Sequence, residues 1–352
     1  DAQGNLLYND TIYPHPPKSE TSMAMKKIST LAEQYKIEAI AIGNGTASRE
    51  TEEVVANFIK KNGYDIQYTI VNEAGASVYS ASKLATEEYP DLDVTTRGAM
   101  SLGRRLQDPL SELVKIEPKS IGVGQYQHDV PPARLEESLT GVVEDCVNSV
   151  GVDLNTASPS LLSKVAGLNS GIASNIITYR EENGKFTDRK QLLKVAKLGP
   201  KAYEQCAGFL RITDGENILD NTGVHPESYK AAKELLSLCG FKAADIGTDS
   251  IKEIKTKVEE IGFDSVAEKL GIGVPTLNDI IKELIQPARD PRDELPAPIL
   301  RKDVLEMKDL KPGMVLTGTV RNVIDFGVFV DIGVHQDGLV HISQICDRFI
   351  KH

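Results

Sequence analysis

The first 130 residues alternate between compact apolar runs and stretches whose apolar positions recur at helical spacing. Residues 37–42 and 66–71 are short apolar runs that predict β-strands, and residues 6–12 are a further strand candidate. Residues 22–35 have the helical spacing, and Ser48 is expected to cap a second helix. Alternation of strands and helices at these lengths predicts a mostly parallel sheet covered by helices.

The pattern changes twice beyond this α/β region. Residues 135–285 contain no convincing strand, and glycines divide them into short helical stretches, which predicts short helices joined by tight turns. Residues 286–298 hold four prolines among charged residues and are typical of a linker. Three alternating segments follow, at 314–320, 327–332 and 338–342, and they predict antiparallel strands that open a small barrel.

These patterns define the fold class that we expect, a multidomain chain with an α/β unit, an all-α array and a partial β-barrel. The expected boundaries are 1–133 for the α/β unit, 134–212 for a pair of helical hairpins, 213–285 for a further helical module, 286–310 for the linker and 311–352 for the partial barrel. The chain begins without an initiator methionine and stops directly after strand-like segments, so we expect a fragment of a longer protein.

Composition narrows the function classes. Charged residues make up 26% of the 352 residues and apolar residues 40%, which indicates globular domains, and no apolar run is long enough to span a bilayer. The four cysteines lie far apart without metal-type spacing, which favours a reducing cytoplasm and indicates no metal site. We expect no cofactor and no small-molecule substrate. The net charge of −11 excludes a wholly basic nucleic-acid wrapper but is compatible with a local basic patch.

Two similar blocks in the helical array carry the most specific signal. Residues 161–173 and 192–202 each predict a short helix, a tight turn and a second helix. In such a hairpin, glycine or asparagine in the left-handed conformation turns successive backbone N–H groups outward, and together with the next helix N-terminus they can hold a phosphate. The candidate contacts from these blocks are Gly167, Asn169, Ser170, Gly171, Lys194, Lys197, Gly199 and Lys201.

The charge distribution supports a polyanion at this place. Residues 152–212 hold nine basic and five acidic side chains, a net charge of +4, which leaves −15 for the rest of the chain. A cationic segment in an acidic chain is what a local contact with nucleic-acid phosphates requires. Helical hairpins also pack proteins together, so a protein partner is the alternative.

Both blocks resemble tandem helix-hairpin-helix motifs that bind DNA without reading its sequence. The turn of that family usually reads glycine, apolar residue, glycine, whereas the first turn here is Gly167-Leu168-Asn169. Asparagine tolerates the left-handed region, so we expect this turn to survive. The second turn, Lys197-Leu198-Gly199, has lost its first glycine, and Lys201 stands where the family often has a phosphate-facing lysine.

The C-terminal strands resemble the ribosomal protein S1 type of OB-fold RNA-binding domain. In that family two aromatic residues and a histidine stack against bases of single-stranded RNA, and the resemblance assigns these roles to Phe326, Phe329 and His341. Arg321 is the expected phosphate contact. Because Phe326 and Phe329 have odd spacing, they share a face only if the strand bends at Gly327; otherwise one of them belongs to the core.

The N-terminal unit resembles the YqgF branch of the RuvC and RNase H-like superfamily, whose enzymes hold two divalent metals with carboxylates at strand ends. The candidates here are Glu73, after the second strand, and Asp129, in a later loop. The family's first catalytic aspartate lies on an opening strand that precedes this sequence. We therefore expect vestigial carboxylates without catalysis, and a metal-dependent nuclease or resolvase is the alternative.

The order of these parts resembles the bacterial Tex family of transcription accessory proteins. Long stretches match that family's pattern, at residues 41–50, 72–82, 105–110, 119–130, 224–229 and 288–292. The resemblance implies a scaffold, not an enzyme, that binds RNA, DNA or both and assists transcription. A scaffold that docks on RNA polymerase or the ribosome is the further alternative. The loop 44–50 keeps two interpretations, a phosphate site at a helix N-terminus and a capping loop.

Overall fold

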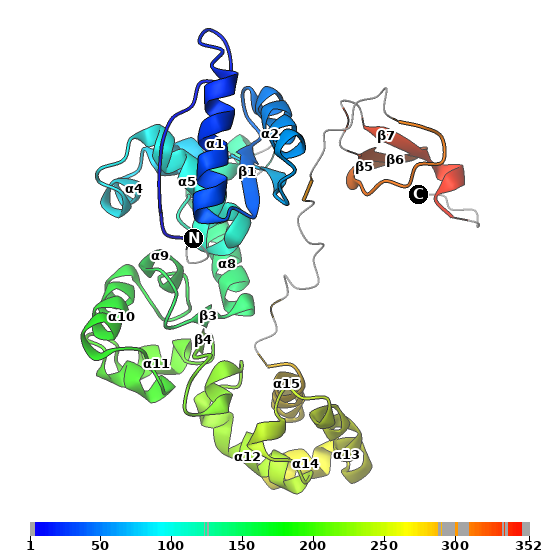
Figure 1. Ribbon diagram of the computed structural model, residues 1–352. Coiled ribbons are helices and arrows are strands. Elements are labelled where there is room, and N and C mark those ends of the chain that lie inside the picture. Colours follow the sequence, from blue (N-terminus) through cyan, green and yellow to red (C-terminus); the bar gives the residue numbers. More distant parts are fainter. Residues whose placement is uncertain are drawn as a thin grey trace. The chain divides into compact units, whose positions relative to one another are not determined.

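The computed structural model describes residues 4–122, 124, 127–287, 290, 300–301, 310–332, 334 and 337–346 (Figure 1). The chain forms two compact units. The first combines Asp1–Glu73 with Pro298–His352, and the second is the intervening segment Ala74–Ala297. The second unit is therefore an insertion within the chain of the first.

The N-terminal part of the first unit is an α/β layer. Its elements are α1 (Thr21–Tyr35), β1 (Ala39–Gly43), α2 (Ser48–Asn62) and β2 (Gln67–Val71). The two strands pair in parallel, as the alternation of strands and helices predicts. Helices and strands share a core in which Phe58 and Tyr68 are fully buried.

Two local predictions in this part are wrong. Residues 6–12 form no strand, and side chains such as Leu7 and Tyr8 are exposed, because a short segment without a partner strand gains little stability. Ser48 is the first residue of α2 and not its cap. The N-cap is Ala47 in the left-handed conformation, with φ +59°, and its side chain makes no capping hydrogen bond.

One residue of the C-terminal segment extends the parallel sheet. Arg301 forms an antiparallel bridge with Tyr68 through two backbone hydrogen bonds of 2.8 Å. Arg301 Nη1 also lies 3.5 Å from Glu52 Oε1 of α2, and the same oxygen accepts a hydrogen bond from the Tyr68 hydroxyl. The edge of β2 is therefore paired at this point with a residue from far along the chain.

The second unit is helical, as predicted for residues 135–285. Its first elements are α3 (Ala76–Ser80), α4 (Lys83–Glu88), α5 (Val94–Gln107), α6 (Pro109–Leu113), α7 (Pro118–Ile121), the 3-10 helix η1 (Gln127–Asp129) and α8 (Pro132–Val150). The elements of the hairpin region are β3 (Val152–Asp153), α9 (Pro159–Leu162), α10 (Ser170–Asn183), η2 (Arg189–Lys194), α11 (Pro200–Cys206) and β4 (Leu210–Arg211). The last elements are η3 (Ile218–Asn221), η4 (Pro226–Ser228), α12 (Tyr229–Leu238), η5 (Ala243–Asp245), η6 (Ser250–Glu253), α13 (Ile254–Ile261), α14 (Phe263–Leu270) and α15 (Val274–Ile285).

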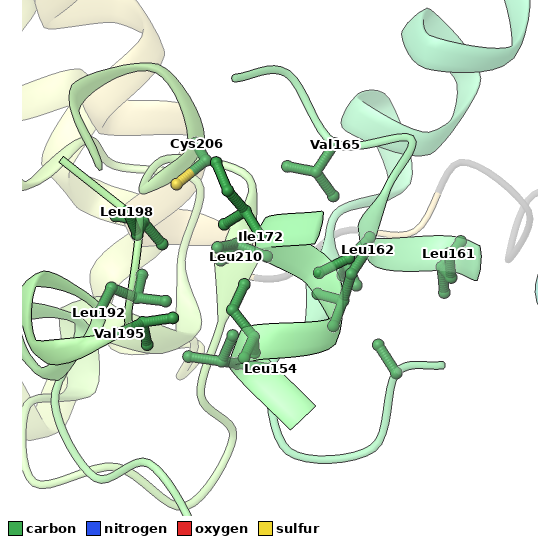
Figure 2. Packing of buried hydrophobic residues seen from close by; sticks show 14 of the residues in the cluster. Leu154, Leu161, Leu162, Val165, Ile172, Leu192, Val195, Leu198, Cys206 and Leu210 are labelled. Atoms are coloured by element: carbon green, nitrogen blue, oxygen red, sulfur yellow. The ribbon is translucent and has the colours of Figure 1, made fainter. Parts of the chain in front are cut away.

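Three hydrophobic clusters lie in the described part of this unit; a small one surrounds Tyr79 of α3, and the other two are large. One of the large clusters joins α9, α10, η2 and α11, and Leu154, Leu162 and Leu192 are fully buried in it (Figure 2). The other lies among α12 to α15 and includes Leu235 and Leu277. The short strands β3 and β4, which the sequence does not predict, pair in parallel.

The C-terminal part is a three-stranded antiparallel sheet of β5 (Thr319–Ile324), β6 (Gly327–Asp331) and β7 (Gly338–His341), followed by η9 (Ile342–Gln344). The predicted antiparallel pairing is confirmed, but the described residues show an open sheet and not a barrel, and β5 begins later than predicted. Most of the predicted linker 286–298 lies outside the described residues. Among the helices that the structure describes, none has the length and apolar character needed to cross a membrane.

Candidate nucleic-acid interface

The first hairpin joins α9 to α10. Gly167 takes the left-handed conformation, with φ +78°. Asn169 does not: it is extended, with φ −132°, and as the N-cap of α10 its Oδ1 accepts a 3.0 Å hydrogen bond from the backbone N–H of Ile172. The exposed residues Ser170 and Gly171 form the first turn of α10, where backbone N–H groups lack partners within the helix. Asn169 therefore preserves the turn by capping and not by left-handed geometry.

The second hairpin joins η2 to α11 and keeps a similar backbone although its first glycine is a lysine. Lys197 has φ +64°, close to the value of Gly167. Leu198 is buried as the apolar middle residue, and Gly199 is the extended N-cap of α11, with φ −83° and ψ 172°. The loss of the glycine leaves the turn in place, with a lysine held in a region that is unfavourable for L-residues.

The two hairpins contact each other directly. Asn175 of α10 donates a 2.7 Å hydrogen bond from Nδ2 to the carbonyl oxygen of Ala196 in the second block. In return, Gly167 lies so close to α11 that a Cβ added to it would come within 2.6 Å of the Cβ of Gln205. Figure 2 shows the apolar side chains of both hairpin blocks in one cluster. The spacing of the two turns is therefore fixed by contacts in both directions.

Lysines surround the second hairpin. Lys194 ends η2, Lys197 lies in the turn, and Lys201 is in the first turn of α11; all three side chains are exposed. Cations beside open backbone N–H groups suit a phosphate ligand, because both favour negative charge.

The charge count of the hairpin segment overstates the cations that face solvent. Arg189 is 1% exposed, and Arg180 Nη1 donates hydrogen bonds to two backbone carbonyl oxygens. Burial lowers the pKa of Arg180 and that of Arg211 from the ordinary arginine value. Since these arginines serve the fold, the lysines carry the exposed positive charge.

The two aromatic residues of the C-terminal sheet lie together. The ring centroids of Phe326 and Phe329 are 6.4 Å apart, and the rings meet edge to face at 80°. Gly327 between them has φ +158°, and its backbone lies so close to the Val340 carbonyl that a Cβ has no room. Gly327 is the first residue of β6, so Phe326 lies in the turn before the strand and its ring meets that of Phe329 from there.

His341 joins the aromatic pair through strand pairing. It lies opposite Gly327 in the β6–β7 pair, and Leu339 lies opposite Phe329. Residues directly opposite each other point to the same face, so His341 and Phe329 share one face of the sheet. Phe326 is 51% exposed and Phe329 is half-buried. The ring of Phe329 is therefore partly covered, whereas the ring of Phe326 faces solvent.

Arg321, the expected phosphate contact, is paired with a carboxylate of the neighbouring strand. Its Nη2 donates a 2.6 Å hydrogen bond to Asp331 Oδ2, which makes an ion pair across β5 and β6. A phosphate at Arg321 would have to compete with this carboxylate. Arg321 is therefore a weaker candidate phosphate contact than the hairpin lysines.

Family models match each of these parts in turn. The Tex protein YqgF-like domain matches residues 1–107, the Helix-hairpin-helix motif 147–211, the HHH domain 217–292 and the S1 RNA binding domain 309–352. All of the chain aligns with the Transcriptional accessory protein Tex of Neisseria gonorrhoeae, at 50% identity over 354 residues. Over its whole length the chain is therefore similar to part of the Tex-family proteins.

Other similar proteins extend the comparison. The Uncharacterized protein YdcI of Bacillus subtilis is 56% identical over 352 residues, and the Protein tex of Bordetella pertussis is 50% identical over 355 residues. Each alignment covers 100% of this chain but only 48% of the Bacillus protein, 45% of the Neisseria protein and 44% of the Bordetella protein. The chain therefore spans less than half the length of these Tex relatives.

The two candidate carboxylates belong to different units of the chain. Glu73 follows β2; its backbone N–H donates a 3.0 Å hydrogen bond to Asn44 Oδ1, and its carboxylate lies against Gly45. Glu73 therefore lies where sites form in parallel sheets, and its charge disfavours a phosphate in the loop 44–50. Asp129 is an exposed residue of η1 in the second unit. Within the described part of the chain, no group of three or more His, Cys, Asp or Glu residues is arranged to hold a metal.

The HHH domain contains a hairpin that the sequence analysis missed. Gly271-Ile272-Gly273 joins α14 to α15, with Gly271 left-handed at φ +66° and Gly273 the extended N-cap at φ −76° and ψ 153°. This backbone resembles that of the two hairpins described above. The tripeptide itself was the available signal, because it has the glycine, apolar residue, glycine order of the helix-hairpin-helix turn without alteration.

Proposed function

We propose that this chain is a sequence-tolerant nucleic-acid-binding scaffold that assists transcription. In this proposal, exposed lysines and backbone N–H groups of the paired hairpins bind the phosphates of RNA or DNA, and the C-terminal sheet stacks bases on its aromatic residues. A relative named as a transcriptional accessory protein supports the role. The machinery that this role calls for is RNA polymerase or the ribosome, and the YqgF-like unit serves as a platform without nuclease activity.

The reciprocal packing of the two hairpins is the observation that carries the proposal. The hydrogen bond from Asn175 and the close approach of Gly167 to α11 set the distance between two turns of similar geometry. Phosphates repeat at regular intervals along a strand, so a fixed pair of turns binds two of them without an ordering cost at the moment of binding. Packing alone does not require three exposed lysines around one turn.

Fluorescence anisotropy with labelled single-stranded RNA and double-stranded DNA, titrated across a salt series, tests this proposal. We expect binding that weakens steeply with salt, and the double change Lys194→Glu with Lys201→Glu should reduce the slope of log K against log salt by about 2, since about one unit is lost per phosphate contact. Magnesium is present throughout, and the integrity of the probe is checked on a gel.

A matched control reverses two exposed lysines of the other helical module that lie away from its hairpin turn, Lys233→Glu with Lys255→Glu, and changes the net charge by the same amount. This control should keep most of the affinity if the hairpins are the site. Equal losses in both double variants would indicate a general charge effect and no site. Wild-type binding that ignores salt would refute the phosphate contacts, and a cut probe would show nuclease activity in place of a passive platform.

A further inference from the structure

The helical unit buries one arginine in a dense set of hydrogen bonds. Arg189 is 1% exposed. Its Nε donates to the carbonyl oxygen of Leu210 at 2.6 Å, Nη2 to that of Thr222 at 2.5 Å, and Nη1 to that of Val224 at 2.8 Å and to the Tyr229 hydroxyl at 2.7 Å. These partners come from β4, from the segment before α12 and from the start of α12. A single guanidinium thus connects the hairpin pair to the helical module that follows it.

A buried carboxylate completes the cluster. Asp220, with no exposed surface, accepts a 3.1 Å hydrogen bond from the backbone N–H of Arg189 and a 2.5 Å hydrogen bond from the Tyr229 hydroxyl. The charge of the guanidinium is therefore matched within the cluster and does not reach solvent. Only a guanidinium supplies five donors in a planar fork, so a lysine cannot reproduce this set of contacts.

The position of Arg189 along the chain links this cluster to the proposed interface. Arg189 is the first residue of η2, Lys194 is its last, and the turn at Lys197 follows directly. Lys190 and Lys194 are exposed while Leu192 between them is fully buried, so one face of η2 points to solvent and the other into the core. The guanidinium holds the start of η2 while Asn175 binds the Ala196 carbonyl at the other end of this stretch.

We propose that Arg189 is a positioning residue for nucleic-acid binding: it fixes η2 against the module that follows, and thereby keeps the lysines of the second hairpin in register with the first hairpin. The inference rests on the proposed function, because register matters only if both hairpins meet one nucleic acid. Arg189 itself touches no ligand. Its effect on binding passes through the placement of Lys194, Lys197 and Lys201.

Amide hydrogen exchange on the whole chain tests the positioning without any nucleic acid. In Arg189→Met, the amides of Val195 and Leu198 should exchange at least tenfold faster than in the wild type. The corresponding amides of the first block, Val165 and Leu168, should change much less. All four amides are hydrogen-bonded to backbone carbonyls in the wild type, which makes the comparison fair. An equal increase in both blocks would overturn the proposal, because it would show general loosening.

Arg97→Met is the matched control for the loss of a buried arginine. Arg97 is 7% exposed and donates hydrogen bonds to the Tyr89 carbonyl and the Thr86 hydroxyl on the α4–α5 side of the same unit. This variant should leave exchange at Val195 and Leu198 unchanged. If Arg189→Met does not fold, Tyr229→Phe removes a single partner of the guanidinium and should give the same pattern at smaller amplitude. Arg189→Lys should fail to restore protection, and full rescue by lysine would show that charge alone is needed.

Anisotropy titrations then connect the position to binding. Folded Arg189→Met should bind at least tenfold more weakly than the wild type at fixed salt and with a smaller salt slope, because fewer lysines meet phosphates together. In the Lys194→Glu and Lys201→Glu background, the same change should have no further effect. An additive loss there would overturn the positioning role. If the wild type binds no nucleic acid, the proposed function fails, while the exchange experiment still decides whether Arg189 fixes the second hairpin.

Discussion

The equivalent first positions of the three hairpins should respond in opposite directions to small substitutions. These positions are Gly167, Lys197 and Gly271, and all three have positive φ, at +78°, +64° and +66°. They differ in chemistry and in surroundings. A Cβ at Gly167 would meet Gln205 at 2.6 Å, whereas a Cβ at Gly271 would meet nothing within 4 Å. Lys197 already carries a Cβ and tolerates the strain.

Magnitudes follow from these surroundings. Alanine at an open left-handed position costs about 1 kcal/mol, so Gly271→Ala should destabilise by about that amount. Gly167→Ala adds overpacking against α11, which brings its cost to about 2–4 kcal/mol. Lys197→Gly relieves about 1–2 kcal/mol of strain and loses about 0.5–1 kcal/mol through the flexibility of glycine in the unfolded chain. The net result is a stabilisation of about 0.5–1 kcal/mol.

Thermal unfolding followed by far-UV circular dichroism measures these differences, because the helical unit dominates the signal. For a unit of this size, Tm should fall by about 5–15 °C in Gly167→Ala and by about 2–4 °C in Gly271→Ala, and rise by about 1–4 °C in Lys197→Gly. Lys197→Gly should also bind nucleic acid more weakly, because it loses a cation. Equal shifts for the two alanine variants would refute the close packing of the first hairpin on α11. A lower Tm in Lys197→Gly would refute the left-handed backbone at Lys197.

Three more outcomes can be tested. Phe326→Ala should weaken binding of single-stranded RNA by about 1–3 kcal/mol, as expected for the loss of one stacked base, and leave double-stranded DNA binding nearly unchanged in parallel anisotropy titrations. Asp331→Asn should raise RNA affinity and steepen its salt dependence, because it removes the carboxylate paired with Arg321, whereas Arg321→Ala alone should change little; a large loss in Arg321→Ala would contradict this order. The hydrogen bond from Lys27 lowers the pKa of Asp10 to about 2, below its unfolded value, so the stability it contributes is present above about pH 4 and is lost as the pH falls towards 2. Asp10→Asn should therefore flatten the loss of Tm between pH 4 and 2, and an unchanged acid limb would show that the pair with Lys27 contributes nothing.

The sequence predicts helices and strands best where the hydrophobic periodicity agrees with the positions of glycine and proline between them. The parallel strands, the helix Thr21–Tyr35 and the glycine-divided array all follow from local pattern. The strand predicted at residues 6–12 does not form, because a local pattern does not say whether a partner strand exists. The N-cap of α2 is wrongly predicted for a similar reason, since nothing in the small apolar side chain of Ala47 signals the left-handed conformation.

The same distinction between local pattern and distant contacts applies to the residues of the candidate site. The exposed lysines are close in sequence to their turn, and the aromatic pair to its hairpin, so short turns and strand pairing set their neighbours. The sequence does not indicate the role of Arg189, because a count of charges treats every arginine as a surface group. The burial of Arg189 depends on backbone carbonyls of residues more than 20 positions away. The pairing of Arg321 with Asp331 is likewise set by the sheet and not by the local sequence.

The bridge between Tyr68 and Arg301 has a consequence for how the chain folds as it is made. Arg301 emerges from the ribosome 233 residues after Tyr68, which at bacterial rates of about 5–20 residues per second is a delay of about 12–47 s. During this time the edge of β2 has no partner from the C-terminal segment, while the inserted helical unit can complete its hydrophobic cores. The α/β layer is therefore begun first and its sheet finished after the helices, so newly made chains spend many seconds with an unpaired strand edge.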